Sequence, residues 1–335
     1  MKPIFNPDQH QVAWRKILRC FPEANFLQSP NWGEMNRLIG YRPIILQPEP
    51  HTWCLAIVKS AKRGRYLEVP GGPLLDWQDS TELQQMFAAL KTFAREQHCV
   101  FIRLRPQLAK TDQNLALLQD LGLRRAPMHL HAEHTVILDL TQSEAELMKN
   151  LRRQTRYEVR RADKLGLTVD WSNTEAAFRE FERVQADTAA RQHFVPPSLR
   201  TLLAERLAFG NQARLYVART ADGQPVAYGL ILISGDEAEY FEAASTDLNR
   251  KLPGSYALQW RVIRDLKALG LKRYNLWGIA PPGAKNHRYS GVTTFKTGFG
   301  GDLVEYVPAH DLVLKPGRYL IDLVIETVRK KRRHL

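Results

Sequence analysis

The sequence is poor in cysteine and in long hydrophobic runs, and these absences limit what the protein can be. Its three cysteines, Cys20, Cys54 and Cys99, form no Cys-x-x-Cys pair, which argues against a disulfide framework and a zinc ribbon. The longest apolar run, near residues 230–233, is far too short to cross a bilayer, and the N-terminus lacks a hydrophobic signal segment. We therefore expect a soluble, cytoplasmic protein.

Several catalytic and cofactor-binding motifs are also missing. The chain has no Gly-x-Ser-x-Gly elbow, no Cys/His signature for nucleophilic catalysis and no Gly-rich dinucleotide fingerprint. The Pro-Gly-Gly-Pro turn at residues 70–73 lacks the Gly-Lys-Ser/Thr of a phosphate loop. His129, His131 and His134 lie close in sequence, but no acidic or cysteine ligand is spaced to complete a metal site. We expect no metal, no cofactor and no covalent catalysis.

Positive charge is abundant, with a formal net charge of +13 and a pI near 9.7. Such a balance predicts an anionic partner: nucleic acid, a nucleotide-linked substrate or an acidic membrane surface. Residues 149–164 hold seven Lys or Arg against two acids. Among them Arg152, Arg156 and Arg160 recur at i, i+4 and i+8, which would place them on one helical face suited to a phosphate or pyrophosphate. The alternative is a solvated basic face.

A second basic cluster ends the chain. From residue 315 onward there are seven Lys or Arg against two acids, and five of the seven stand at residues 329–333. These charges would attract tRNA phosphates or anionic lipid. The alternative is a frayed, solubilising tail.

One lysine stands out in the glycine-rich stretch at residues 291–301. Lys296 lies between Phe295 and Phe299, with four glycines around the three residues. The aromatic side chains would draw the ammonium into a partly dehydrated place, where it can stabilise a developing negative charge. The alternative is a solvated lysine in a surface turn.

Helical and strand patterns alternate along the whole chain and predict an α/β (α+β) fold. Helix starts are predicted at Ser29-Pro30, at a capping box of Thr81 and Gln84, and at a second box of Ser143 and Glu146, whose helix would run to near Gly166. Two units of similar element order suggest an internal duplication, although no sequence repeat is visible. The final helix, residues 317–333, has an apolar face that includes Leu320, Leu323, Val324 and Val328.

Five segments, taken together in their order and spacing, indicate a known family. They are Phe26-Leu27-Gln28-Ser29 with Trp32-Gly33, residues 68–73, Thr155-Arg156-Tyr157 with Lys164-Leu165-Gly166, residues 270–276, and residues 290–301. Together they resemble the Fem family, the non-ribosomal peptidyltransferases that add interpeptide-bridge amino acids from aminoacyl-tRNA to peptidoglycan precursors.

The resemblance implies two tandem acetyltransferase-like (GNAT-like) domains. The first would comprise residues 1–142 with 312–335, and the second, residues 143–311, would carry the Phe-Lys pair. The long helical hairpin that some members insert in the second domain is absent, so a compact form without the coiled-coil arm is expected. The last helix would pack on the first domain.

The resemblance also implies residue roles. Lys296 would stabilise the charge on the aminoacyl ester, the backbone carbonyl of Phe295 would orient the attacking amine, and Arg156 would contact a diphosphate. Tyr240 lies in the strand where the family places a substrate-contacting tyrosine. Near Trp32 some members carry a phosphate-contacting lysine; this chain has Asn36 there, with Arg37 beside it.

The resemblance predicts an aminoacyltransferase of cell wall biogenesis, with aminoacyl-tRNA as co-substrate and a nucleotide- or lipid-linked muropeptide precursor as acceptor. It would be a cytoplasmic monomer, with peripheral contact to the inner face of the plasma membrane through the basic C-terminal helix. Two alternatives remain: a GNAT-like N-acyltransferase with another donor such as acyl-CoA, and a non-catalytic RNA- or membrane-binding protein. The transferred amino acid and any general base cannot be inferred.

Overall fold

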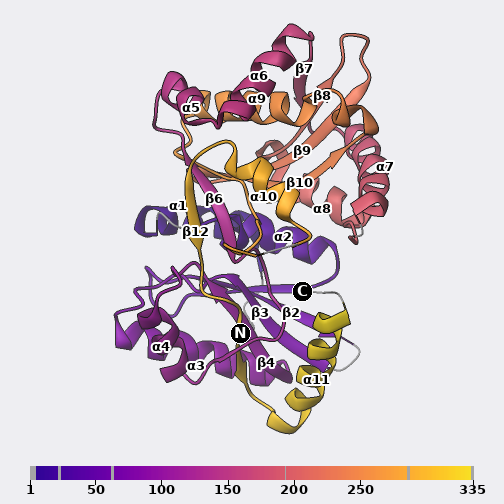
Figure 1. Ribbon diagram of the computed structural model, residues 1–335. Coiled ribbons are helices and arrows are strands. Elements are labelled where there is room, and N and C mark those ends of the chain that lie inside the picture. Colours follow the sequence, from indigo (N-terminus) through magenta and orange to yellow (C-terminus); the bar gives the residue numbers. More distant parts are fainter. Residues whose placement is uncertain (1–4, 22–23, 62–63, 193, 285–286, 333–335) are drawn as a thin grey trace. The chain divides into compact units, whose positions relative to one another are not determined.

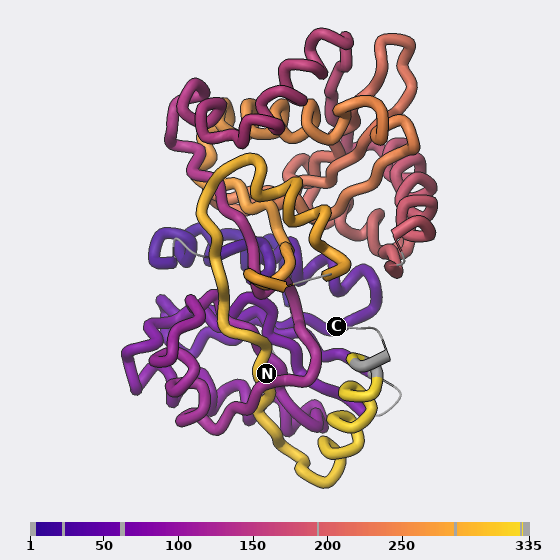
Figure 2. Tube along the Cα trace, viewed as in Figure 1, coloured from indigo at the N-terminus to yellow at the C-terminus, as the bar shows by residue number. Residues whose placement is uncertain are grey.

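A computed structural model describes residues 5–21, 24–61, 64–192, 194–284 and 287–332 (Figure 1). The chain forms two compact units: Met1–Glu133 with Glu305–Leu335 (unit 1), and His134–Val304 (unit 2). The sequence analysis placed these borders at 142/143 and 311/312. The unit border precedes β6 (His134–Asp139) because that strand pairs with β11 (Arg273–Asn275) of unit 2. Figure 2 follows the chain, whose yellow C-terminal part rejoins unit 1.

Unit 1 is built on a six-stranded sheet with one parallel pair. Its strands, in spatial order, are β1 (Arg42–Leu46), β2 (Cys54–Ala61), β3 (Gly64–Gly71), β4 (Cys99–Pro106), β13 (His310–Val313) and β5 (Arg124–Arg125). β3 and β4 are parallel and are joined through helix α3 (Ser80–Glu96). The apolar face of α3, with Met86 and Leu90, packs on the sheet in one core cluster. β13, which follows unit 2 in the sequence, lies between β4 and β5 and completes the sheet.

Unit 2 repeats this plan in a seven-stranded sheet. Its strands, in spatial order, are β12 (Asp302–Glu305), β6, β11, β10 (Glu237–Ser245), β9 (Pro225–Ser234), β8 (Ala213–Arg219) and β7 (Thr168–Ser172). β10 and β11 are parallel and are joined through helix α9 (Gly254–Ala268). In both units the parallel pair is therefore bridged by one helix and flanked by antiparallel strands, which supports the predicted internal duplication.

The interior strand β9 is buried on both faces. Ala227, Ile231 and Ile233 belong to the core cluster that includes residues of α9, whereas Tyr228 contacts Phe181 of helix α7 (Glu175–Gln192). This alternation is that of a strand with period two, and helices on both faces explain why the strand reads as a continuous apolar run. α7 and α8 (Leu199–Phe209) are the two helices between β7 and β8, and the described residues contain no longer helical hairpin there.

Helix caps agree with the sequence in part. Ser29 caps α2 (Pro30–Leu38), and Ser143 with Glu146 forms a capping box at α5 (Glu144–Asn150), as predicted. The predicted box at Thr81 is wrong: Asp79 accepts hydrogen bonds from the backbone N–H groups of Thr81 and Glu82, because aspartate is the stronger cap two residues earlier.

The basic helix predicted from Ser143 to near Gly166 is broken. Leu151 and Arg152 are extended, with ψ of 138° and 145°, so α5 ends there and α6 (Arg153–Lys164) begins. Arg152 is the N-cap of α6 and lies outside its helical turns, so only Arg156 and Arg160 of the predicted triplet share its face.

The remaining helices complete the two units. They are α1 (Pro7–Cys20), α4 (Asp112–Asp120), α10 (Ser290–Thr297), α11 (Pro316–Arg332) and the 3-10 turns η1 (Phe26–Gln28), η2 (Gly210–Gln212) and η3 (Asp247–Arg250). In the part of the chain that the structure describes, none of the helices could cross a membrane.

Candidate functional site

The candidate site lies in unit 2, where two parallel strands separate. β10 pairs with β11 only over residues 237–239 and 273–275, whereas β10 continues to Ser245 beside β9. Beyond these residues the two strands are no longer paired, which leaves an opening in the hydrogen-bonded sheet at their carboxyl ends. Openings at the carboxyl ends of parallel strands are common places for ligands in α/β proteins.

Lys296 enters this opening from α10. The glycine-rich stretch around it is not a surface turn, because residues 290–297 form a helix. The Lys296 side chain is buried, and its Nζ donates a hydrogen bond to the Gly278 carbonyl oxygen at 2.9 Å. Nζ also lies 5.6 Å from the centre of the Tyr240 ring. Two predicted site residues, Lys296 and Tyr240, are thus brought together.

The segment that receives the lysine is held in an uncommon conformation. Trp277, just before Gly278, has a φ of 61°, which is costly for a large side chain. Its backbone N–H donates to Asn275 Oδ1 at 2.9 Å, and its carbonyl oxygen accepts from Thr135 Oγ1 at 3.2 Å. The α10 residue Thr293 accepts a hydrogen bond from the Ala280 N–H at 2.8 Å. These bonds fix the direction of the Gly278 carbonyl.

A β-bulge in β10 brings an acidic residue to the site. The register against β9 shifts between Tyr240 and Glu242, so the two side chains, which a regular strand would place on one face, leave the strand on different faces. Tyr240 packs near Gly229 and Leu258 on the α9 side. Glu242 accepts a hydrogen bond from Gln185 Nε2 of α7 at 2.7 Å.

Burial shifts the proton equilibria of this group strongly. Desolvation lowers the pKa of Lys296 to about 7, while the charge of Glu242 acts in the opposite direction. Desolvation raises the pKa of Glu242 to about 7, opposed by the Gln185 hydrogen bond and by Lys296. Burial and the neighbouring Glu242 also raise the pKa of Glu205 well above its usual value. The site therefore holds a lysine and a carboxyl group that both titrate near neutral pH.

The aromatic neighbours of Lys296 behave as predicted. Phe299 is buried, and Phe295 is half-buried and packs edge-on against Phe299 and Tyr256 at centroid distances of 5.2 and 5.1 Å. The Phe295 carbonyl oxygen accepts a hydrogen bond from the Gly298 N–H at 3.1 Å. A carbonyl oxygen has two lone pairs, so this contact occupies only one of them.

The end of α10 is closely packed against the start of α6. The Gly298 carbonyl accepts from the Arg152 N–H at 2.9 Å, and a Cβ at Gly298 would lie 2.4 Å from Thr155 Oγ1. Only glycine fits there without a shift. The exposed Arg152 is thus beside the helix that carries Lys296, and its binding role stays a prediction.

Arg156 and Arg160 differ in their surroundings. The Arg156 guanidinium is half-buried and donates to the carbonyl oxygens of Met148 and Lys149, at 3.3 and 2.9 Å, at the end of α5. Arg160 is exposed. Arg156 therefore has a structural role that the sequence did not reveal, in addition to the binding role that remains a prediction.

In unit 1, Arg37 is paired with Glu34 on the surface. A nearby lysine, Lys59, was not predicted from the sequence. Arg37 makes two hydrogen bonds to Glu34, at 2.7 and 2.6 Å. Lys59 of β2 donates from Nζ to Asn36 Oδ1 at 2.8 Å and lies 3.7 Å from the centre of the Tyr41 ring. Desolvation lowers the pKa of Lys59, against the attraction of Glu68. An ammonium thus stands beside Asn36 although the sequence shows none there.

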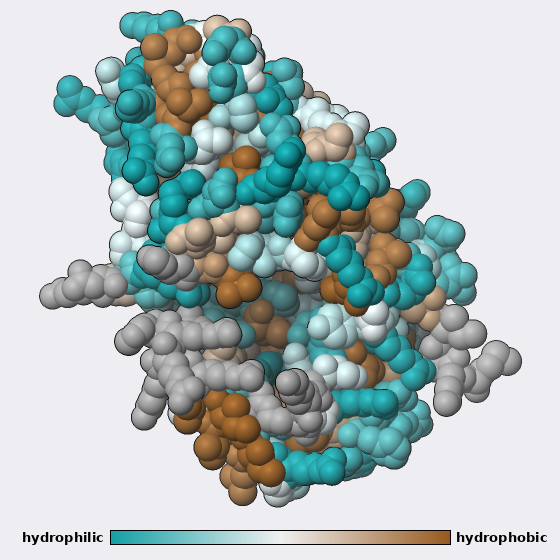
Figure 3. Space-filling model, turned by 90° about the vertical axis from the view of Figure 1, so that its right-hand side faces the viewer, coloured by the Kyte–Doolittle hydropathy of each residue, from teal (hydrophilic) through white to brown (hydrophobic). Residues whose placement is uncertain are grey.

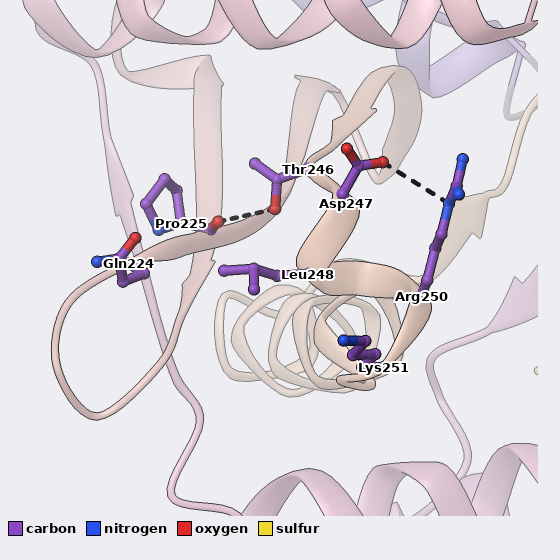
Figure 4. Close-up of a pocket in the computed structure, with 7 residues that line it drawn as sticks. All are labelled: Gln224, Pro225, Thr246, Asp247, Leu248, Arg250 and Lys251. Atoms are coloured by element: carbon purple, nitrogen blue, oxygen red, sulfur yellow. Dashed lines mark hydrogen bonds and ion pairs between the residues drawn. The ribbon is translucent and has the colours of Figure 1, made fainter.

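An open hollow of about 530 Å³ follows the end of β10 (Figure 4). Its lining includes Arg250 and Lys251, and it lies near the start of α9. A phosphate at that helix start would need free backbone N–H groups. Asn249 Oδ1 already accepts from the Ser255 N–H at 3.0 Å, and the Gly254 N–H donates to Leu252 O. The first two backbone N–H groups of α9 are therefore already engaged within the protein.

No metal-binding cluster is found among the residues that the structure describes: groups of three or more His, Cys, Asp or Glu side chains suited to an ion do not occur there. His131 is half-buried in unit 1, and desolvation lowers its pKa well below the usual value. A neutral, partly buried imidazole is a common structural element.

Two duplicated sheets, each with a parallel pair bridged by a helix, define a protein of two tandem acetyltransferase-like domains, the second with a buried lysine at its open strand ends. The structure resembles that of FemX, with a TM-score of 0.82 over 94% of this chain and 98% of that chain at 16% identity. It also resembles a tandem GNAT protein from the clavulanic acid biosynthesis pathway, with a TM-score of 0.54 over 92% and 96% of the two chains at 12% identity.

Sequence comparison identifies the family. The model of the FemAB family matches residues 19–120, 121–221 and 206–326, so the chain belongs to the FemAB family. The aminoacyltransferase FemA of Staphylococcus epidermidis is 31% identical over 97 residues, 29% of this chain and 23% of that protein. The match thus spans less than a quarter of the relative's length.

Proposed function

We propose that the protein is an aminoacyltransferase that moves an amino acid from aminoacyl-tRNA to the amine of a peptidoglycan precursor stem peptide. The observation that carries this proposal is the buried Lys296 at the carboxyl ends of β10 and β11. Membership of the FemAB family and the aminoacyltransferase relative support the reaction class. Aminoacyl-tRNA is the co-substrate, and the reaction needs no further cofactor.

The chemistry follows from an activated donor. The acceptor amine attacks the ester carbonyl, the bond from that carbon to the ribose oxygen breaks, and the proton lost by the amine balances the one gained by the ribose hydroxyl. Such a reaction needs proximity and an oxyanion stabiliser more than a side-chain nucleophile. Lys296 in its protonated form supplies the positive charge for the oxyanion, and the second lone pair of the Phe295 carbonyl orients the amine.

Glu242 has a positioning role in this scheme. Burial alone would leave Lys296 neutral over much of the physiological range, and the Glu242 carboxylate favours the charged form. Gln185 holds that carboxylate in place. The pair thereby keeps a cation available at a dehydrated site, where its electrostatic effect is stronger than in water.

The basic groups would bind the precursor and the tRNA. Arg152 and Arg160 are exposed cations suited to phosphate, Arg156 is held beside them, and Tyr240 lines the site. In unit 1, Lys59 beside Asn36 is a further candidate for a phosphate of the precursor, with Arg37 on the same helix as Asn36. The enzyme would act as a cytoplasmic monomer, with peripheral membrane contact through its basic C-terminal helix.

The test is transfer of radiolabelled amino acids from a mixed pool of charged tRNA onto nucleotide-linked and lipid-linked muramyl-pentapeptide, with wild type beside Lys296→Met. We expect label on the acceptor with wild type and a loss of about 10² to 10³ in kcat with the variant. The labelled product identifies both the amino acid and the acceptor. Absence of transfer to either acceptor would refute the proposed reaction.

A further inference from the structure

The C-terminal helix α11 is anchored in unit 1 by one face. Tyr319 is buried and its hydroxyl donates to Asp311 Oδ2 at 2.8 Å. Arg103 of β4 bonds Asp311 and also donates to Glu326 Oε2 at 2.8 Å. Leu323 packs in the same small cluster as Tyr319. Positions 319, 323 and 326 recur at helical spacing, so this set defines the inward face.

The opposite face of α11 is apolar and uncovered. Leu320, Ile321, Val324 and Val328 are exposed to 57%, 56%, 61% and 44%. Their spacing of one, four and eight residues places them on one stripe. The expectation that Leu320, Val324 and Val328 share an apolar face with Leu323 is therefore wrong: Leu323 packs inward and the other three point outward. Figure 3 shows hydrophobic residues gathered at the lower end of the face on which α11 lies.

In the sequence, basic residues precede and follow the segment that carries this stripe. At the start of the helix Arg318 is exposed, whereas Lys315 Nζ donates to the His98 carbonyl oxygen at 3.1 Å, and in the sequence residues 329–333 are Arg-Lys-Lys-Arg-Arg. Of the two acidic residues in this segment, Glu326 is already bonded to Arg103. A helix with an exposed apolar face and cations around it has the composition of one that lies in a membrane interface.

We propose that the outer face of α11 docks the protein on an anionic lipid bilayer, with the four aliphatic side chains in the boundary of headgroups and acyl chains and with attraction between lipid phosphates and the positive charge of the segment, which includes the exposed Arg318. The inference deepens the membrane contact in the proposed function, and it can be tested without tRNA. Charge complementarity favours lipid over a second copy of the chain, because pairing two such helices would bring their basic ends into one interface.

Flotation with vesicles of phosphatidylcholine, with or without phosphatidylglycerol, tests the proposal. Wild type should bind the anionic vesicles and bind pure phosphatidylcholine far less. The double variant Leu320→Ser/Val324→Ser should bind at least about tenfold more weakly, since it lacks two aliphatic side chains that would enter the bilayer. The control is Leu207→Ser, which alters an exposed leucine of α8 in unit 2 and should leave binding unchanged. All of these positions are exposed, so the variants should fold.

Three outcomes would overturn the docking proposal. Equal binding by wild type and the double variant would show that the apolar stripe does not contact the bilayer. Equal binding of wild type to neutral and anionic vesicles would show that the basic residues do not contribute. A wild-type dimer in sedimentation experiments that the double variant abolishes, without vesicle binding, would assign the stripe to a second copy. Transfer onto the nucleotide-linked acceptor, measured in parallel, reports on the proposed reaction alone, so failure of one proposal is distinguishable from failure of the other.

Discussion

The Lys296 ammonium donates a hydrogen bond to the Gly278 carbonyl oxygen at 2.9 Å, so a residue of α10 fills the opening between β10 and β11. The cost of burying this amine shows in its lowered pKa. An enzyme that retains a costly group at such a place gains something from it, and in the proposed reaction the gain is a cation at the developing oxyanion.

The first prediction concerns stability. The pKa of Lys296 falls from 10.5 to about 7 on folding, so between these values the unfolded chain binds the extra proton. Stability of wild type should therefore rise with pH across this window on account of Lys296. Lys296→Met removes the penalty, so its Tm should exceed that of wild type at pH 7, and the difference should shrink toward pH 10.5. Thermal unfolding across pH, with the exposed Lys164→Met as control, measures this; a constant difference would contradict it.

The second prediction concerns the pH profile of transfer. If protonated Lys296 stabilises the oxyanion, the rate should fall above its pKa of about 7. Glu242→Gln removes a charge that favours protonation, so the falling limb should move to lower pH. Asp187→Asn, an exposed position on the same helix as Gln185, should leave the profile unchanged. A Glu242→Gln enzyme with slower turnover but an unmoved limb would give that residue a purely structural role.

A pair of glycines on one segment provides a third test. A methyl group at Gly298 would meet Thr155 Oγ1 at 2.4 Å, whereas at Gly291 no atom lies within 4 Å. Gly298→Ala should lower both the Tm and the transfer rate, because α10 must shift. Gly291→Ala should leave the rate unchanged. It should raise the free energy of unfolding by up to about 1 kcal/mol, because alanine has a higher helix propensity than glycine. Equal effects of the two changes would argue against close packing at α6.

The fourth prediction separates the two arginines of α6. Arg156→Ala removes hydrogen bonds to the α5 carbonyls and should cost about 1.5 kcal/mol of stability as well as weakening a phosphate-bearing ligand several-fold. Arg160→Ala, at an exposed position, should weaken binding of the phosphate-bearing ligand without a change in Tm. Calorimetry of the variants with the nucleotide-linked precursor tests both effects. Unchanged affinity in both variants would exclude this face from the site.

Local patterns predicted the helix starts at Ser29 and Ser143, because their caps are clear in the sequence. Lys296 was found for its aromatic neighbours, yet the helix around it was not, since glycines obscure helical propensity. Glu242 was missed because a bulge, which depends on the partner strand, directs it toward Gln185. Lys59 was missed because its neighbour Asn36 lies 23 residues away in the sequence. The apolar face predicted for α11 grouped Leu323 with residues that point outward, because periodicity shows that a face is apolar and not what covers it.

The insertion of β13 between β4 and β5 has a consequence for synthesis. The ribosome delivers every other strand of that sheet before the first residue of unit 2, but the strand that joins β4 to β5 emerges only after unit 2 is complete. Until then β4 presents an open edge of unpaired backbone groups, the kind of edge that invites association with other chains. Truncations before residue 310 should therefore aggregate through this edge, whereas the full chain should not.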